Sequence, residues 1–344
     1  MSMSTIGSLF PVVEASIEDT VAGLTAWVAV VNDPPWAELS GRVSAPSAVI
    51  AAWDMDRDHL ETLVPLIPDN AETIVGIGGG TALDTAKFLA WKSGLPLIQA
   101  PTIASVDAGF TDAIGVRVGR RVSYIGNVTP ELVVVDLEVL TGAPPRLNRA
   151  GIGDILSCHT GLFDWKVASD RGEGAPWRND LADLGTTLLS ELDQAADEVG
   201  AVSRDGIRFL MSAYRRIGAA CAQAGHSRFE EGSEHFLGYA YEFRTGAHLV
   251  HGELIALAVM AMSTVQGNDP EWVAQVIRRS RIRAHPSESA IDRATFIQTL
   301  QGLRQFVSDE GYDYCIVNEV DVEEGCANRA WDAVASLPRE GMSE

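Results

Sequence analysis

The chain has 344 residues, of which 46% are apolar and 21% charged, which excludes a disordered, collagen-like or disulfide-scaffold protein. At roughly 150 residues per domain, this length predicts about two domains. The net charge of −21 repels phosphate backbones and anionic lipids, so we expect neither a nucleic-acid partner nor a membrane partner.

The lack of recognisable targeting signals and the spacing of the cysteines both favour the cytoplasm. No segment approaches the ~18 uninterrupted apolar residues of a membrane span, and the first residues carry no basic region typical of a secretion signal. The four cysteines, Cys158, Cys221, Cys315 and Cys326, lie far apart without a CxxC pair, which indicates reduced thiols. We therefore expect a cytoplasmic protein in which any metal is bound by nitrogen and oxygen.

The first part of the chain reads as strands separated by helices. Short apolar, β-branched runs predict strands, and apolar residues at three- and four-residue spacing predict helices. The predicted strands are 26–33, 47–54, 73–80, 95–102 and 132–140, and the predicted helices are 56–72 and 81–94. Such alternation implies a parallel sheet with helices on its faces.

The pattern changes near Pro144 and Pro145, and from Asp154 onward it is helical almost throughout. The predicted helical segments are 155–168, 183–199, 207–224, 252–265, 272–282 and 295–308. We predict an α/β domain with a Rossmann-like parallel sheet over residues 1–147 and an all-α domain over residues 148–344. A cleft between domains is the default place for a ligand.

A glycine-rich segment, GIGGGTALDTAK at 76–87, follows the predicted strand 73–80 and opens a helix. Glycines let backbone N–H groups approach a phosphate, and a helix N-terminus favours an anion. The spacing is neither GxGxxG nor a P-loop, so a tight strand-to-helix turn is an equal alternative. Lys87 is one of only three lysines; it either serves this site or forms a local pair with Asp84.

The segment PTIASVD at 101–107 follows the next predicted strand, at the edge where open α/β sheets bind ligands. Hydroxyls at Thr102, Ser105 and Thr111 can bond a ribose, a phosphate or a carboxamide, and Asp107 can accept from a substrate hydroxyl. The alternative is that these residues only form turns.

Asp154, His235 and His251 each stand where a predicted helix opens. Two imidazoles and one carboxylate suit Zn²⁺ or Fe²⁺, and three protein ligands leave a position open for substrate. A metal there can polarise a carbonyl or stabilise an alkoxide. The alternatives are helix caps and structural histidines. The remaining histidines are interpreted as structural or surface residues, and only His248 is also considered for proton exchange: His59, His159, His226, His248 and His285.

In this order, the motifs GGGTALDTAK, PTIASVD, PELVVVDLEVL, AGIGDILSCHTGLFDW, HSRFEEGSEH and HGE resemble the metal-dependent dehydrogenases. This family includes glycerol dehydrogenase, iron-containing alcohol dehydrogenases and glycerol-1-phosphate dehydrogenase, and has a dehydroquinate synthase-like fold. The resemblance covers about residues 74–253. It implies an NAD- or NADP-dependent, metal-dependent oxidoreductase that interconverts a small polyol or polyol phosphate and its ketone.

The resemblance also implies the roles of particular residues. Cofactor-binding residues would be Gly78, Gly79, Gly80, Thr81, Ala82, Asp84, Lys87, Thr102, Ile103, Ala104, Ser105 and Thr111. Asp154, His235 and His251 would bind Zn²⁺, with Fe²⁺ or Ni²⁺ as alternatives. The candidate catalytic residues are Asp107, Asp154 and Tyr239. We expect a small-molecule substrate and a homo-oligomer. Asp33, at the end of the first predicted strand, favours NAD over NADP because it would repel a 2′-phosphate, although a capped turn explains it equally well.

Three positions depart from the glycerol-1-phosphate dehydrogenase pattern. Cys158 and Tyr239 stand where that branch has a lysine and a histidine, and Ala108 follows Asp107 where it has glycine. The lost cations weaken the case for a phosphorylated substrate, unless other basic residues compensate: Arg146, Arg149, Lys166 or Arg244. Two other functions remain open. One is a dehydroquinate synthase-like cyclase or lyase that uses NAD transiently, which the aspartate at 154 disfavours because those enzymes have glutamate there. The other is a non-catalytic binding homologue.

Overall fold

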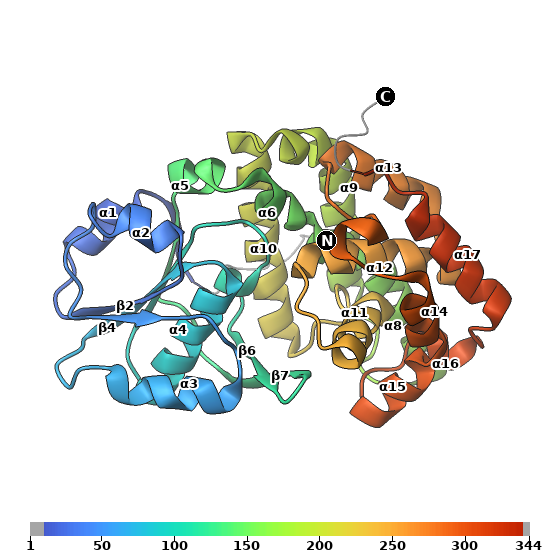
Figure 1. Ribbon diagram of the computed structural model, residues 1–344, viewed down its shortest axis with the longest axis horizontal. Coiled ribbons are helices and arrows are strands. Elements are labelled where there is room, and N and C mark those ends of the chain that lie inside the picture. The colour runs from blue at the N-terminus through green and yellow to red at the C-terminus, as the bar shows by residue number, and fades with distance from the viewer. Residues whose placement is uncertain (1–9, 340–344) are drawn as a thin grey trace. The chain divides into compact units, whose positions relative to one another are not determined.

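The computed structural model describes residues 10–339, which form two compact units (Figure 1). The first unit comprises residues 10–148 and 210–223, and the second comprises 149–209 and 224–339. Each unit is described by itself. None of the described helices is long and apolar enough to cross a membrane.

A six-stranded sheet forms the centre of the first unit, with the strand order β1-β8-β5-β4-β2-β3. Every neighbouring pair is parallel, as the alternation of strands and helices in the sequence predicts. The strands are β1 (Val12–Glu14), β2 (Trp27–Val31), β3 (Ala48–Ala51), β4 (Thr73–Gly78), β5 (Leu97–Pro101) and β8 (Leu132–Val135).

Helices cover both faces of this sheet (Figure 1). On one face, α3 and α4 enclose a core that includes Leu60, Phe88 and Ile74; on the other, α1 and α2 enclose one that includes Ile17, Trp27 and Val75. The helices of this part of the chain are α1 (Ile17–Ala22), α2 (Pro35–Leu39), α3 (Arg57–Leu63), η1 (Val64–Leu66), α4 (Gly80–Ser93), η2 (Ala108–Phe110), α5 (Leu137–Gly142) and α6 (Pro145–Ala150).

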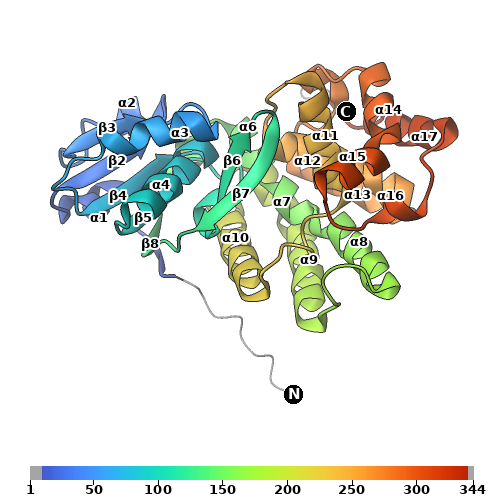
Figure 2. The ribbon, with the colours of Figure 1, turned by 90° about the horizontal axis from the view of Figure 1, so that it is seen from below.

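Two features of the first unit differ from the sequence prediction. The strand predicted over 132–140 is wrong beyond Val135, because the Asp136 side chain accepts from the backbone N–H groups of Glu138 and Val139 and so caps α5. An antiparallel ribbon, β6 (Ala113–Val118) and β7 (Arg121–Asn127), was not predicted. Ile114 and Val116 of the ribbon belong to the same core as the buried residues of α4, and Figure 2 shows β6 and β7 side by side.

All described secondary-structure elements of the second unit are helices, as predicted. The segment 155–168 is broken at Ser157, which separates α7 from α8. The helices are α7 (Ile152–Leu156), α8 (Cys158–Arg171), α9 (Asn179–Ala201), α11 (Ser233–Thr245), α12 (His251–Gln266), α13 (Pro270–Ser280), η3 (Pro286–Ser289), α14 (Arg293–Gln301), α15 (Leu303–Glu310), α16 (Ile316–Glu319) and α17 (Glu324–Ala335). Helix α10 (Arg204–Ala224) contributes residues 210–223 to the first unit.

Candidate functional site

The glycine-rich segment lies where β4 ends and α4 begins, at the carboxyl edge of the sheet. Gly79 is the N-cap of α4 and has no side chain to cap the first turn of this 14-residue helix. A Cβ atom added to Gly79 would lie 2.8 Å from Ile103, and one added to Gly80 would lie 2.9 Å from Val106. A side chain at either glycine would therefore force Ile103 or Val106 of the segment 102–107 to move away from the helix start.

This arrangement fits a dinucleotide. Helix α4 offers backbone donors and the positive end of its dipole to an anion. Beside it, the hydroxyl oxygen of Thr102 is buried and has no hydrogen-bond partner among the described residues. A buried hydroxyl without a partner is unfavourable, and a bound ligand can satisfy it. Asn32, at the end of β2, accepts from the Gly79 N–H at 3.4 Å and holds the glycine turn.

Two buried side chains hold the segment 102–107 in place. The Ala104 N–H donates to Asn148 Oδ1 at 2.8 Å, and the Tyr214 hydroxyl donates to the Ala104 carbonyl at 2.9 Å. Asn148 also donates to the Leu140 carbonyl at 2.6 Å. Sequence reasoning missed both residues, since they lie 44 and 110 positions from Ala104 and no local motif contains them.

Asp84 and Lys87 contact each other and the start of β6. The Lys87 ammonium is buried, 2.7 Å from Asp84 Oδ1, and donates to the Ala113 carbonyl at 2.6 Å and to the Thr111 hydroxyl at 3.2 Å. Burial raises the pKa of Asp84, and the positive charge of Lys87 opposes that rise. Within this structure, the pair therefore positions Thr111 and Ala113.

The first unit thus gathers most of the proposed cofactor residues along one edge. The residues Gly78, Gly79 and Ala82 are buried, Gly80 and Thr81 are partly buried, and the segment containing Ile103, Ala104 and Ser105 lies next to them. Asp107 is partly buried at the N-cap of η2.

The second unit brings Asp154, His235 and His251 together from α7, α11 and α12. One potential ligand atom of each lies within 4.8 Å of the others. The distance between His251 Nε2 and Asp154 Oδ1 is 3.4 Å. Bonds of about 2.0–2.2 Å to a tetrahedral Zn²⁺ place ligand atoms roughly 3.4 Å apart, so this pair matches a shared metal.

Two glycines beside these residues allow α7 and α12 to approach each other. A Cβ atom on Gly153 would lie 2.6 Å from the Gly252 backbone, and one on Gly252 would overlap the Ala150 carbonyl. Gly153 precedes Asp154, and Gly252 follows His251. The backbone contact therefore sets the distance between the two metal-ligand candidates.

Glu234 orients the third candidate. Its Oε1 lies 2.9 Å from His235 Nδ1 and accepts from the Gly232 N–H at 2.6 Å. A proton held on Nδ1 leaves Nε2 as the metal-binding atom, the common carboxylate–histidine–metal arrangement. Burial lowers the pKa of His235, but the Glu234 hydrogen bond and the charges of Glu231, Glu234 and Asp154 outweigh it and raise this pKa to about 9. This acidic environment favours a cation.

Tyr239 lies one helical turn after His235, and its ring centre is 5.9 Å from the imidazole. Its hydroxyl donates to Glu231 Oε1 at 3.3 Å. Cys158 is a buried thiol whose pKa is raised well above its ordinary value, first by burial and then by the charges of Glu230 and Glu234. Two of the three departures from the glycerol-1-phosphate pattern, Cys158 and Tyr239, therefore place neutral groups among carboxylates.

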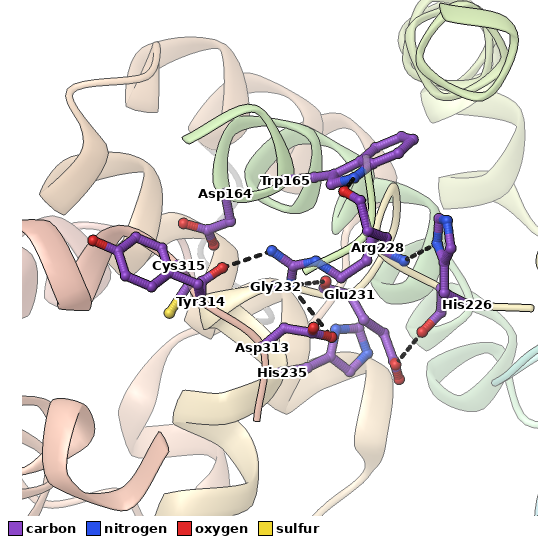
Figure 3. A network of polar contacts seen from close by, with 12 residues as sticks. Asp164, Trp165, His226, Arg228, Glu231, Gly232, His235, Asp313, Tyr314 and Cys315 are labelled. Atoms are coloured by element: carbon purple, nitrogen blue, oxygen red, sulfur yellow. Dashed lines mark hydrogen bonds and ion pairs between the residues drawn. The ribbon is translucent and has the colours of Figure 1, made fainter. Parts of the chain in front are cut away.

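Longer-range contacts fix the start of α11. Asp164 of α8 accepts from the Ser233 N–H at 2.7 Å and from the Ile316 N–H at 2.8 Å, so it caps α11 and α16 together. Figure 3 shows the adjacent Arg228, whose buried guanidinium donates to the Tyr314 carbonyl at 2.7 Å and lies 3.8 Å from Asp313. One local indication of the contacts around His235 was present in the sequence, because Glu234 directly precedes His235.

Comparison with known proteins agrees with this geometry. Residues 37–144 match the iron-containing alcohol dehydrogenase family. Glycerol-1-phosphate dehydrogenase [NAD(P)+] of Cenarchaeum symbiosum is 30% identical over 241 residues, 69% of this chain and 67% of the relative. That of Hyperthermus butylicus is 28% identical over 266 residues, 77% of this chain and 73% of the relative.

Solved structures show the same fold. A probable glycerol dehydrogenase from Sinorhizobium meliloti superposes with a TM-score of 0.71 at 19% identity, covering 93% of each chain. Glycerol dehydrogenase from Schizosaccharomyces pombe superposes with a TM-score of 0.68 at 19% identity, covering 91% of this chain and 84% of that one.

The α/β unit with its glycine turn and the helical unit with its histidine–aspartate cluster define a dehydrogenase. The chain belongs to the iron-containing alcohol dehydrogenase family. The prediction of a metal-dependent dehydrogenase that acts on CH–OH groups with a nicotinamide cofactor is confirmed at the level of this family.

Proposed function

We propose that this protein interconverts a small polyol and its ketone, using NAD(P) and one divalent metal ion. The observation that carries the proposal is the convergence of Asp154, His235 and His251 within 4.8 Å, beside a carboxylate that fixes the His235 tautomer. Asp154, His251 and Nε2 of His235 would hold the ion. The ion supplies Lewis-acid polarisation of a C–O bond, and the nicotinamide supplies hydride transfer.

The protein's own residues then have separable tasks. Glu234 holds the proton on His235 Nδ1, which keeps Nε2 available as a ligand. The glycine turn and α4 would bind the pyrophosphate, and Thr102 and its neighbours would bind near the nicotinamide. Asn148 and Tyr214 fix the backbone of that second segment. Asp107 would accept a hydrogen bond from the substrate, and Tyr239 would contribute a hydroxyl near the metal ligands.

Two observations favour different substrates of this class. The named relatives act on glycerol-1-phosphate. The carboxylates around His235 and the neutral Cys158 and Tyr239 favour an unphosphorylated polyol, because a phosphate would be repelled there. Of the four basic residues that could compensate, two are engaged by other groups: Lys166 pairs with Asp170, and Arg149 donates to the Gly200 carbonyl at 2.9 Å. On this charge balance, we favour dihydroxyacetone and glycerol over their phosphates.

The test follows oxidation of NADH and of NADPH with dihydroxyacetone and with dihydroxyacetone phosphate, with and without added Zn²⁺. We expect zinc-dependent oxidation, faster with NADH because Asp33 follows β2 and would repel a 2′-phosphate. A kcat/KM higher for the phosphate would assign the substrate of the named relatives. No oxidation of either coenzyme, with zinc bound, would refute the dehydrogenase proposal.

A further inference from the structure

Trp53 follows β3 and is 70% exposed. A single exposed aromatic residue is ordinary in itself, but Trp53 has a distinctive position in the sheet. β3 lies beyond β2 in the order β5-β4-β2-β3. All these strands are parallel, so Trp53 lies at the same carboxyl edge as the glycine turn after β4.

The strand order assigns the two halves of a dinucleotide to opposite sides of β4. If the glycine turn binds the pyrophosphate and the segment after β5 binds the nicotinamide half, the adenosine half must extend over β2 toward β3. Adjacent strands are about 4.8 Å apart, so β3 lies about 10 Å from β4, a distance that one ribose and one purine ring can span.

The backbone around Trp53 is held in a fixed position. The Ala52 N–H donates to the Val31 carbonyl at 2.7 Å, and the Arg117 N–H donates to the Met55 carbonyl at 2.7 Å. The Trp53 ring centre is 4.3 Å from that of His59, at an angle of 51°. One side of the indole is thus supported by α3 before any ligand arrives, which lowers the entropy cost of stacking.

We propose that Trp53 stacks on the adenine ring of the bound dinucleotide and supplies binding energy for that half of the cofactor alone. The inference rests on the proposed function, because it requires a nicotinamide dinucleotide at the glycine turn. β2 lies between Trp53 and the position proposed for the nicotinamide half, where hydride transfer would take place. It therefore contributes to cofactor affinity and leaves hydride transfer itself unchanged.

The experiment compares binding of NADH, ADP-ribose, AMP and reduced nicotinamide mononucleotide to the zinc-loaded full chain by fluorescence and calorimetry. Trp53→Ala should weaken NADH, ADP-ribose and AMP by about 5- to 10-fold, the lower range for stacking of a base on an aromatic side chain. The mononucleotide, which has no adenine, should bind as before, and kcat at saturating NADH should not change. Trp53→Phe should restore most of the affinity.

Trp91→Phe is the matched control, since Trp91 is also partly exposed but lies in α4 with Lys92 5.2 Å from its ring centre. Unchanged NADH and ADP-ribose affinities in Trp53→Ala would overturn the assignment and leave the dehydrogenase proposal intact. A change in oligomeric state with unchanged adenine binding would also overturn it and indicate an interface between copies of the chain. Failure of the unaltered chain to bind NADH would refute both proposals.

Discussion

Glu234 determines which ring nitrogen of His235 is available to bind a metal. Without its carboxylate, neither imidazole nitrogen would be specified as the ligand, because the proton could occupy either one. The two residues are adjacent in sequence, and the turn at Gly232 lets the Glu234 carboxylate reach both the Gly232 N–H and the ring of His235. A carboxylate in this place both orients the ring and strengthens it as a ligand.

Glu234→Gln should therefore weaken Zn²⁺ binding by about 10- to 100-fold, the usual effect of losing such a partner. Competition with a chromophoric chelator measures this affinity independently of catalysis. Glu319→Gln, which removes a partner of Arg171 on the surface, is the control. Equal zinc affinities in the two variants would show that Glu234 does not act through His235.

The raised pKa of Asp164 predicts that the free energy of unfolding depends on pH. Burial, followed by the charge of Glu234, raises its pKa from 3.8 to about 6. Between pH 3.8 and about 6, the folded chain retains a proton that the unfolded chain has released, so the free energy of unfolding falls as the pH rises through this window. Two pKa units correspond to about 3 kcal/mol.

Urea denaturation of the zinc-free protein from pH 4 to pH 7 measures this contribution. In Asp164→Asn, the free energy of unfolding should fall with rising pH by about 3 kcal/mol less than in the unaltered chain. Asp170→Asn, on the same helix, should behave like the unaltered chain. Parallel pH profiles for all three proteins would contradict the assignment.

The contact between α7 and α12 sets the geometry of two of the three proposed metal ligands. Gly153 and Gly252 have no side chains, so the helices approach until their backbones touch. Asp154 and His251 are the adjacent residues, and their ligand atoms end 3.4 Å apart. A metal site needs this precision, because ligand atoms displaced by an ångström no longer share one ion.

Gly252→Ala should separate the two helices, lower the free energy of unfolding by about 1–3 kcal/mol and reduce zinc affinity by more than 10-fold. Gly325→Ala is the control, since a Cβ there would have only the distant end of Arg329 within 4 Å. Denaturation curves and zinc titrations of both variants test this. Loss of stability with unchanged zinc affinity would show that the contact does not position the ligands.

The position of the segment 102–107 is likewise set by contacts with two other elements, α6 and α10. α6 provides Asn148 and α10 provides Tyr214, and together they satisfy both backbone groups of Ala104. The Tyr214 hydroxyl contributes one hydrogen bond, so its removal should cost about 1 kcal/mol of stability.

Tyr214→Phe should also raise the KM for NADH several-fold while kcat changes less, because the segment loses its fixed position but keeps its side chains. Steady-state kinetics measure both constants. Tyr124→Phe, on the exposed side of β7, is the control. An unchanged KM for NADH in Tyr214→Phe would show that this hydrogen bond serves stability alone.

The two proposed binding regions belong to different compact units, which makes them separable by experiment. The glycine turn and the segment 102–107 lie in the first unit, whereas the three metal-ligand candidates lie in the second. Each unit has its own core, so loss of a ligand from one should leave the fold of the other unchanged.

Chelation of the metal should therefore abolish activity but leave the NADH dissociation constant within about twofold and the helical circular dichroism unchanged. It should lower the melting temperature, because an ion that binds only the folded chain stabilises it. Fluorescence titration of NADH before and after chelation is the measurement. Loss of NADH binding on chelation would show that the metal also organises the first unit.

Local patterns in the sequence were sufficient for the parallel sheet, the glycine turn at 78–80, the helical second half and the types of residue that could bind a metal. These features depend on periodicity, turn chemistry and ligand type, which are visible within a few neighbouring residues. The strand predicted over 132–140 failed because a cap at Asp136 outweighed its β-branched composition.

Other features depended on contacts between distant segments. These include the partners of Ala104, the touching backbones of Gly153 and Gly252, the double cap by Asp164 and the ribbon beside α4. Tyr214 and Ala104 are 110 residues apart, and nothing in either neighbourhood specifies the other. Such pairs form only when the helices pack, because their positions are fixed by the shape of the shared core and not by the local chain.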